Sequence, residues 1–459
     1  MNDDVSNSMN NPKRLPKRPS WREYQSRLKR PAKRVPRRSL MLVLSAISAA
    51  VLCIYMAWPS TGATNVAPTA AKIALSTDET ILIGKKDVQL LLSRLAPNDL
   101  LAESIQLPFK GQRFTVETSL DPTLQDRLID AMDRKNSRYI GVVVMEPDSG
   151  RILAMAGFDK TDPQANPCLH SNFPAASLFK IVTAAAAVDQ CGYSDRTTVR
   201  FNGYKHTLYK NQLKETNNQY TQAVSFGASF AESINPVFGK IGQLYLGKQT
   251  LEEYGLAFGF NQSLDFELPV TPSNLTIRDT PYHWAEIASG FNNETTISPV
   301  HAAMMAASIL NQGRLVPPAL VERIVDAGGR EIYRAHASWE QRTMTTKAST
   351  VLAKMMEKTV QSGTARKLFS GSKRDAILSR LRIGGKTGSI SNRNNDARFD
   401  WFVGFAQDKN GPGQLVVAAL VAHEEYIGVR AATYARMAMA HYFRGQWAQQ
   451  NNTAARSNS

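Results

Sequence analysis

The sequence predicts an α/β domain of the α+β kind, a mostly antiparallel sheet covered by helices, which follows one N-terminal transmembrane helix. Two observations predict the sheet and its cover. Short β-branched runs such as 139–147 and 415–423 are bounded by turn residues, and stretches with helical periodicity lie between such runs. The third observation is the uncharged run 40–58, LMLVLSAISAAVLCIYMAW, which is long enough to cross a hydrocarbon core of roughly 30 Å.

The N-terminal segment predicts the topology of the chain. Residues 1–38 contain twelve Lys or Arg and three acidic residues, so they carry +9 of the net charge of +16. A basic segment beside an apolar run stays in the cytoplasm. We therefore expect a basic cytoplasmic tail at 1–38, a single-pass transmembrane helix at 39–59, and an extracytoplasmic remainder. A cleaved signal peptide and twin-arginine export are the alternatives.

The distribution of charge argues against a nucleic-acid partner. The residues that follow the tail carry only +7, so the bulk of the protein is mildly basic. The tail itself is rich in Pro and Arg and is expected to be a solvated, disordered arm. We expect no binding of nucleic acid.

The predicted elements follow in order after the transmembrane helix. Residues 60–112 are predicted to be a linker and short stalk with one short helix within 86–105. The predicted strands are 113–119, 139–147, 151–158, 382–390, 401–406 and 415–423. The predicted helices are 121–134, 177–190, several within 226–312, and 428–444. They form one domain, 113–445, and the polar segment 446–459 is expected to be a disordered tail.

The three cysteines leave one pairing open. Cys53 lies inside the apolar run, whereas Cys168 and Cys191 flank the first serine motif. In an oxidising compartment Cys168 and Cys191 could form a disulfide. Two unrelated thiols are the alternative, and we favour it.

Ser177 and Lys180 form the first candidate catalytic motif. Ser177 opens an apolar helix, and Lys180 lies three residues on, on the same helix face. A serine hydroxyl needs a base to act as a nucleophile, and a lysine can be that base if burial lowers its pKa. The same Ser-x-x-Lys pattern occurs at Ser26 in the basic tail and at Ser370 in a polar loop, so context favours Ser177. The alternative is a capping serine followed by a solvent-exposed lysine.

Ser233 and Asn235 form the second motif. In an extended segment two side chains at this spacing point the same way, and Pro236 disfavours the α conformation at Asn235. The hydroxyl could relay a proton to a leaving amine, and the carboxamide could hold a substrate amide. The alternative is an ordinary helix end before the proline.

The third motif, from Lys386 to Ser389, lies in a predicted edge strand. Lys386 and Gly388 face one side, where Lys386 would supply a cation and Gly388 would leave room for a ligand. Thr387 and Ser389 offer hydroxyls to a substrate carboxylate. The backbone N–H groups of Ser389 and Ser177 could form an oxyanion hole. The alternative is a strand with a lysine on its exposed face.

The three motifs together resemble those of the penicillin-binding protein transpeptidase family, which serine β-lactamases share. Further stretches are similar to this family, and they are 118–125, 145–155, 296–301, 311–313, 362–366 and 400–405. The resemblance covers roughly 113–445 and implies a β-lactamase/transpeptidase-like fold. The chain departs from the family's pattern at Ala175-Ala176, where Gly-Ser or similar is usual before the nucleophile. Nothing in the sequence resembles the glycosyltransferase domain of bifunctional members.

The resemblance implies a serine-type D-Ala-D-Ala transpeptidase, which forms an acyl-enzyme at Ser177 from peptidoglycan stem peptides and cross-links them in cell wall synthesis. The implied catalytic residues are Ser177, Lys180, Ser233, Asn235 and Lys386. The implied substrate-binding residues are Thr387, Gly388 and Ser389, and no metal or cofactor is expected. The expected partners are stem peptides, β-lactam antibiotics, the inner membrane through one helix, and a separate glycosyltransferase acting in trans.

Two other classes of function remain open. A D,D-carboxypeptidase or a β-lactamase would use water as the acceptor. No Glu-x-x-x-Asn occurs between Ser233 and Lys386, which disfavours a class A β-lactamase. A non-catalytic β-lactam-binding sensor or scaffold would keep the fold, but the intact motifs and a tail too short for an effector domain argue against it.

Overall fold

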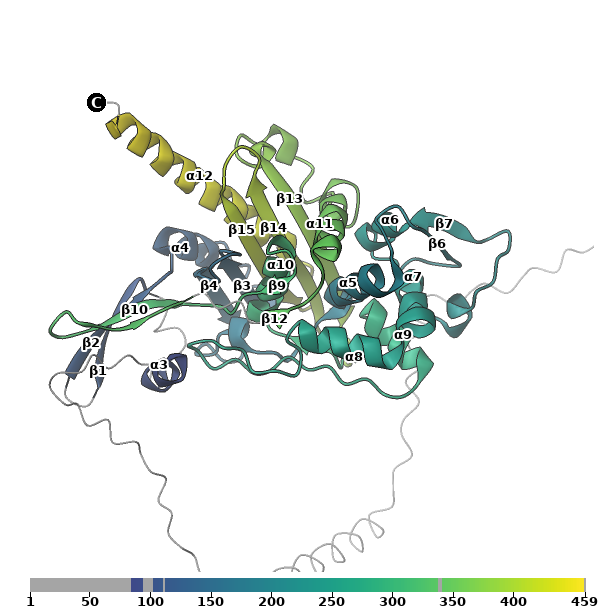
Figure 1. Ribbon diagram of the computed structural model, residues 1–459, viewed down its shortest axis with the longest axis horizontal. Coiled ribbons are helices and arrows are strands. Elements are labelled where there is room, and N and C mark those ends of the chain that lie inside the picture. Colours follow the sequence, from purple (N-terminus) through teal and green to yellow (C-terminus); the bar gives the residue numbers. More distant parts are fainter. Residues whose placement is uncertain (1–83, 94–101, 110–111, 337–340, 458–459) are drawn as a thin grey trace, which may run out of the picture. The chain divides into compact units, whose positions relative to one another are not determined.

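A five-stranded sheet forms the centre of the computed structural model (Figure 1). The structure describes residues 84–93, 102–109, 112–336 and 341–457, all of which belong to the unit Glu79–Ser459. Every neighbouring pair of strands in the sheet is antiparallel, as the sequence predicts. The strands, in their order across the sheet, are β13 (Leu381–Ser391), β14 (Arg398–Asp408), β15 (Gln414–His423), β3 (Ser137–Met145) and β4 (Ile152–Asp159).

Helices cover both faces of this sheet. Side chains alternate along β15, so Val416 and Ala418 join one apolar core while Val417 and Ala419 join the other. A strand that is buried on both faces is apolar throughout, and this explains the run LVVAALVAH. The helices on the first face include α5 (Lys180–Cys191), α10 (Pro299–Leu310) and α11 (Thr346–Gln361), and those on the second are α4 (Pro122–Asp130) and α12 (Ala431–Ser457).

The segment between α5 and α10 is mainly helical, as predicted. Its helices are α6 (Phe226–Ala231), α7 (Asn235–Lys240), the π-helical turn η4 (Ile241–Leu246), α8 (Gly247–Ala257) and α9 (Pro281–Ser289). Short strands accompany them, namely β6 (Thr198–Phe201) paired with β7 (Gln222–Ser225), and β5 (Phe173–Pro174) paired with β8 (Thr296–Ile297).

A second sheet corrects the predicted start of the domain at 113. Its strand order is β1-β2-β10-β11, and Figure 1 shows it at the opposite end of the unit from the β6–β7 pair. The segment 60–112, predicted as linker and stalk, therefore contributes a strand to a folded sheet, because β1 pairs with β2 along its whole length. The predicted short helix in this segment is present as α3 (Lys85–Leu92). The strands are β1 (Ser104–Phe109), β2 (Gln112–Thr118), β10 (Val321–Asp326) and β11 (Glu331–Arg334), and a separate pair joins β9 (Arg314–Leu315) to β12 (Gln341–Arg342).

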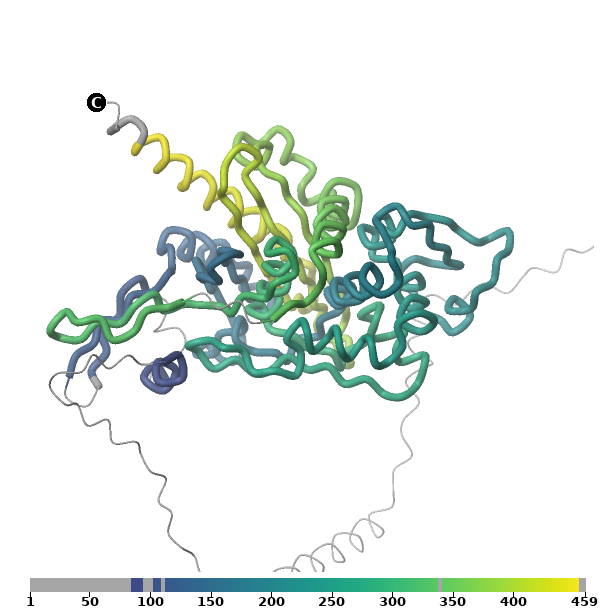
Figure 2. The backbone as a smooth tube through the Cα atoms, in the orientation of Figure 1, coloured from purple at the N-terminus to yellow at the C-terminus, as the bar shows by residue number. Residues whose placement is uncertain are grey.

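The C-terminal segment 446–459 is not the disordered tail that its polar sequence predicts. Helix α12 continues through it to Ser457, and Figure 2 shows the helix running outward toward the C-terminus. The physical reason is Trp447, which is 6% exposed and whose Nε1 donates a hydrogen bond to Asp408 Oδ2 at 2.7 Å. This one apolar anchor extends the packed part of the helix beyond the predicted end at 444.

The predicted tail 1–38 and transmembrane helix 39–59 lie outside the described residues. Within the described ranges, no helix combines the length and apolar character that crossing a membrane requires.

Candidate active site

The turn before α5 presents Ser177. Residues Ala176–Phe179 form one 3₁₀ turn, η2, which runs directly into α5, so the predicted helix begins with a tighter turn than expected. Ala176 has a φ of +48°, a conformation that costs an alanine free energy. Neighbours hold the turn, since Trp401 Nε1 donates to Pro174 O at 2.9 Å. The hydroxyl of Ser177 therefore lies at a constrained corner of the chain.

The side chain of Lys180 connects the first two motifs. It is fully buried, and its Nζ lies 2.8 Å from Ser177 Oγ and 2.7 Å from Asn235 Oδ1, and also donates to Ser289 O. Burial lowers the pKa of Lys180 well below its usual value, and the positive charge of Lys386 lowers it further. The alternative of a solvent-exposed lysine is therefore wrong.

Ser233 and Asn235 occupy a turn between two helices. Ser233 has a φ of +56°, and Asn235 is the first residue of α7, so the predicted extended segment is wrong. Pro236 lies at the start of the helix, where its missing N–H costs no hydrogen bond. The turn still brings both side chains to the cluster, because Asn235 contacts Lys180 while Ser233 Oγ lies 3.0 Å from Lys386 Nζ.

Lys386 lies on the edge strand β13, as the sequence predicts. Its side chain is fully buried, which excludes the alternative of a lysine on an exposed face. Its Nζ donates to Ser233 Oγ and, at 2.8 Å, to Thr387 O. Burial lowers the pKa of Lys386 to about 7. Two buried lysines with lowered pKa values and two serines thus lie within one cluster, an arrangement suited to proton transfer.

The three residues after Lys386 have different neighbours. Thr387 Oγ1 lies 2.5 Å from Thr364 Oγ1, and Ser389 Oγ lies 3.3 Å from Asp400 Oδ1. A Cβ at Gly388 would lie 3.4 Å from the Cβ of Ala176. Gly388 therefore lies directly beside the turn before Ser177, and the predicted room for a ligand at this position stays a prediction. The predicted oxyanion hole of two backbone N–H groups stays a prediction.

Several residues of the cluster were not predicted. Ser289 O accepts a hydrogen bond from Lys180, and a Cβ at the following Gly290 would lie 1.9 Å from Ala176 O. His206 is close enough to both motif lysines for them to influence it, and its pKa is lowered by burial and then by the charge of Lys180. Ser289 is the last residue of α9 and His206 lies between β6 and β7, so both reach the motifs only through the fold and no local pattern marks them. Thr364 alone had a signal, since 362–366 is among the stretches that resemble the family.

Cys168 and Cys191 are both free thiols, which confirms the favoured reading. Cys168 is buried, and its Sγ lies 3.4 Å from Ala156 O. Burial raises its pKa. Cys168 is therefore a packing residue of the core.

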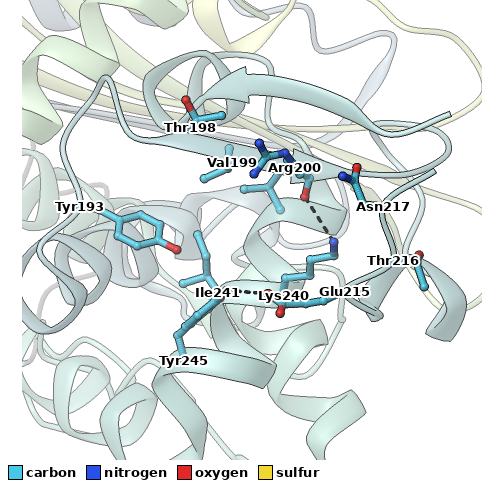
Figure 3. Close-up of a pocket in the computed structure, with 11 residues that line it drawn as sticks. Tyr193, Thr198, Val199, Arg200, Glu215, Thr216, Asn217, Lys240, Ile241 and Tyr245 are labelled. Carbon is cyan, nitrogen blue, oxygen red and sulfur yellow. Dashed lines mark hydrogen bonds between the residues drawn. The ribbon is translucent and has the colours of Figure 1, made fainter. Parts of the chain in front are cut away.

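A pocket of about 280 Å³ lies apart from the cluster, between β6, the end of α7 and η4 (Figure 3). Lys240 Nζ points toward it and donates to Arg200 O at 3.3 Å, and Tyr245 donates its hydroxyl hydrogen to Glu215 at 2.6 Å. None of the eight predicted site residues lines this pocket. Within the described part of the chain, no group of three or more His, Cys, Asp or Glu side chains is arranged to hold a metal ion.

Curated relatives and solved structures resemble this chain over most of the described domain. It is 25% identical over 346 residues to the peptidoglycan D,D-transpeptidase PbpA of Mycolicibacterium smegmatis, covering 67% of each chain. It is 23% identical over 299 residues to the stage V sporulation protein D of Bacillus subtilis, covering 60% of this chain and 44% of that protein. Much of the length of some relatives is therefore unmatched.

Solved structures show the same fold. The D,D-transpeptidase domain of a peptidoglycan glycosyltransferase from Eggerthella lenta superposes with a TM-score of 0.60 at 22% identity, over 72% of this chain and 83% of that one. The imipenem acyl-enzyme complex of penicillin-binding protein A from M. tuberculosis gives 0.59 at 20% identity, over 71% and 78%. The predicted transpeptidase-like fold is confirmed.

Residues 140–440 match the family described as "Penicillin binding protein transpeptidase domain". This range contains all three motifs and more than half of the chain. The chain therefore belongs to the penicillin-binding protein transpeptidase family.

Proposed function

We propose that this protein is a peptidoglycan D,D-transpeptidase, a serine acyltransferase that cross-links stem peptides during cell wall synthesis. The observation that carries this proposal is the position of Lys180 Nζ, which is buried between Ser177 Oγ and Asn235 Oδ1 with a lowered pKa. Relatives that are named as peptidoglycan D,D-transpeptidases support the substrate class.

The first half of the reaction acylates the enzyme. Neutral Lys180 accepts the hydroxyl proton of Ser177 as Oγ attacks the carbonyl carbon between the two D-alanines of a donor stem peptide. The bond to the departing nitrogen then breaks. Ser233 delivers its hydroxyl proton to that nitrogen and regains a proton from Lys386, whose Nζ contacts Ser233 Oγ, and free D-alanine leaves. The stem peptide remains as an ester on Ser177.

The second half transfers the peptide. An amine from a second stem peptide attacks the ester carbonyl and loses a proton to Lys386 through Ser233, while Lys180 returns its proton to Ser177 Oγ as the ester bond breaks. A new amide bond forms, and the Ser177 hydroxyl is restored. By analogy with penicillin-binding protein A from M. tuberculosis, which forms an acyl-enzyme complex with imipenem, β-lactam antibiotics acylate Ser177.

We further propose the location and partners that the sequence predicts. The basic tail and apolar run at 1–59 support a single-pass inner-membrane protein with an extracytoplasmic or periplasmic domain. A separate glycosyltransferase in trans supplies the glycan strands.

The acceptor is tested by the steady-state release of D-alanine from a D-Ala-D-Ala peptide with and without an amine acceptor. A transpeptidase produces a cross-linked amide and a rate that responds to the acceptor. A rate that is indifferent to the amine, with only hydrolysed product, would instead show a D,D-carboxypeptidase. Hydrolytic turnover of penicillin would show a β-lactamase, and an inert but folded protein would show a sensor or scaffold.

A further inference from the structure

A buried carboxylate lies beside the last residue of the third motif. Asp400 is the cross-strand partner of Ser389 in the β13–β14 register, and it is 3% exposed. Opposed side chains on neighbouring strands lie close together on one face of the sheet. Asp400 thus lies next to the cluster. Among the described residues, no hydrogen bond joins it to either catalytic lysine.

Three groups fix the carboxylate of Asp400 by hydrogen bonds, and a fourth group lies near it. The guanidinium of Arg430 donates to both oxygens, at 2.8 Å from Nε to Oδ2 and at 2.7 Å to Oδ1. The backbone N–H of Ala431 donates to Oδ2 at 3.0 Å, and Ser389 Oγ donates to Oδ1 at 3.3 Å. His423 lies near, with Nε2 at 3.8 Å from Oδ2. A bidentate Arg–carboxylate pair fixes the orientation of both partners.

The charge state of Asp400 determines which group donates. Burial alone would raise its pKa, but His423 and then Arg430 lower it, to about 2. An ionised carboxylate can only accept hydrogen bonds, so the hydroxyl hydrogen of Ser389 points at Asp400. A hydroxyl has only one hydrogen, and that of Ser389 is already donated to Asp400. Toward a ligand, Ser389 can therefore act only as a hydrogen-bond acceptor.

We infer that Asp400, held by Arg430, is a positioning residue that fixes the Ser389 hydroxyl as a hydrogen-bond acceptor toward the substrate. Ser389 then receives an N–H group of the bound peptide. This role replaces the donation to the substrate carboxylate that the sequence predicted for Ser389. Donation to the carboxylate falls to Thr387 and to the charge of Lys386. This assignment rests on the proposed function.

A double-mutant cycle on full-length protein tests whether Asp400 acts through Ser389. The second-order rate of acylation by a fluorescent penicillin is measured for the wild type, Asp400→Asn, Ser389→Ala and the double variant. An asparagine can turn its NH₂ group toward Ser389, which frees the hydroxyl hydrogen and removes the acceptor. We expect each single variant to lose about tenfold, the order of one hydrogen bond, and the double variant to lose no more than either single variant.

The controls separate positioning from a general loosening of the fold. Asp408→Asn changes the same residue type on the same strand, where Asp408 contacts Trp447 of α12, and should leave the acylation rate unchanged. Ser389→Thr keeps a hydroxyl and should restore most of the rate.

Two results would overturn the inference. Additive losses in the double variant would mean that Asp400 acts through the packing of α12, and unchanged rates in both single variants would mean that the orientation of Ser389 has no effect. Absence of label in the folded wild type would count against the proposed function, and it is therefore distinguishable from both.

Discussion

The proposed chemistry of this protein depends on the protonation state of the Lys180 amine. Lys180 Nζ has three acceptors around it, on Ser177, Asn235 and Ser289. A buried ammonium loses its hydration, and the nearby charge of Lys386 adds repulsion, so the pKa of Lys180 is lowered from both causes. A lysine that is neutral near the working pH can accept the serine proton, which an ordinary surface lysine cannot.

Replacing Lys180 with arginine should abolish most of the acylation. A guanidinium keeps the positive charge but does not lose its proton in proteins, so the general base is removed. We expect the rate of labelling by a fluorescent penicillin to fall by about 10²–10⁴-fold. Lys373→Arg is the matched control, since Lys373 ends the other Ser-x-x-Lys sequence outside the N-terminal tail, and it should label like the wild type. A Lys180→Arg variant with near-normal labelling would exclude Lys180 as the base.

The sequence predicted which side chains come together better than it predicted the backbone conformation that brings them together. Spacing alone placed Lys180 beside Ser177, because three residues span less than one helical turn. Spacing did not predict the left-handed conformation of Ser233, which lies in the turn between α6 and α7. Asp400 was also missed, since it reaches Ser389 only through strand pairing, and register cannot be read from one strand.

At the scale of elements, two loops meet behind the nucleophile. Gly290 ends α9 with a φ of +63°, and a Cβ there would lie 1.9 Å from Ala176 O. Ala176 itself has a positive φ and immediately precedes Ser177. The end of α9 therefore supports the turn that presents the hydroxyl.

Gly290→Ala should displace this turn and slow acylation. The added methyl group strains the left-handed backbone and also collides with Ala176. Gly192→Ala is the matched control, because Gly192 ends α5 with a φ of +68° and a Cβ there meets nothing within 4 Å. Both variants should lose about 1–2 kcal/mol of unfolding free energy from backbone strain. We expect Gly290→Ala to lose more unfolding free energy than Gly192→Ala and to be labelled by a fluorescent penicillin markedly more slowly. Equal behaviour of the two variants in urea unfolding and in labelling would contradict this.

At the scale of the whole molecule, the buried Lys386 lowers the free energy of unfolding at neutral pH. Burial lowers the pKa of Lys386 to about 7, whereas a lysine in the unfolded chain has a pKa of about 10.4. Between these values the unfolded chain binds more protons than the folded one. The contribution of Lys386 to the free energy of unfolding therefore rises with pH across this window.

Lys386→Met should reduce this pH dependence. The wild type is expected to gain up to about 1.4 kcal/mol per pH unit from this one group between pH 7 and 10. The Lys386→Met variant lacks this gain and also loses acylation. Its free energy of unfolding relative to that of the wild type should therefore be highest near pH 7 and fall as the pH rises. Urea unfolding of both proteins at pH 7, 8 and 9 measures the difference. Parallel stability curves would mean that Lys386 is not depressed in the folded state.

The C-terminal helix gives a second test of stability. Trp447 is 6% exposed and bonds to Asp408, whereas the residues at 448–453 are exposed. We expect Trp447→Ala to cost about 3–5 kcal/mol and to lower the melting temperature. Removal of residues 450–459 should leave the melting temperature unchanged. A similar loss in both would show that the exposed turns also contribute.

The limits of prediction at this scale follow from sequence separation. The central sheet could be predicted, because each strand is a local apolar run with turn residues at its ends. The second sheet could not, since β2 pairs with β10 about two hundred residues later in the chain, as in the pairing of Glu117 with Arg323. The packed end of α12 was missed because a single tryptophan within a polar segment anchors it.

The most direct test of the central claim is the covalent attachment of a fluorescent penicillin, followed by peptide mapping of the labelled residue. The wild type should carry the label on Ser177, and Ser177→Ala should carry none. Ser370→Ala, the matched control from the other Ser-x-x-Lys sequence outside the tail, should label normally. Label that survives in a folded Ser177→Ala variant, or a folded wild type that takes no label, would contradict the assignment of Ser177 as the nucleophile.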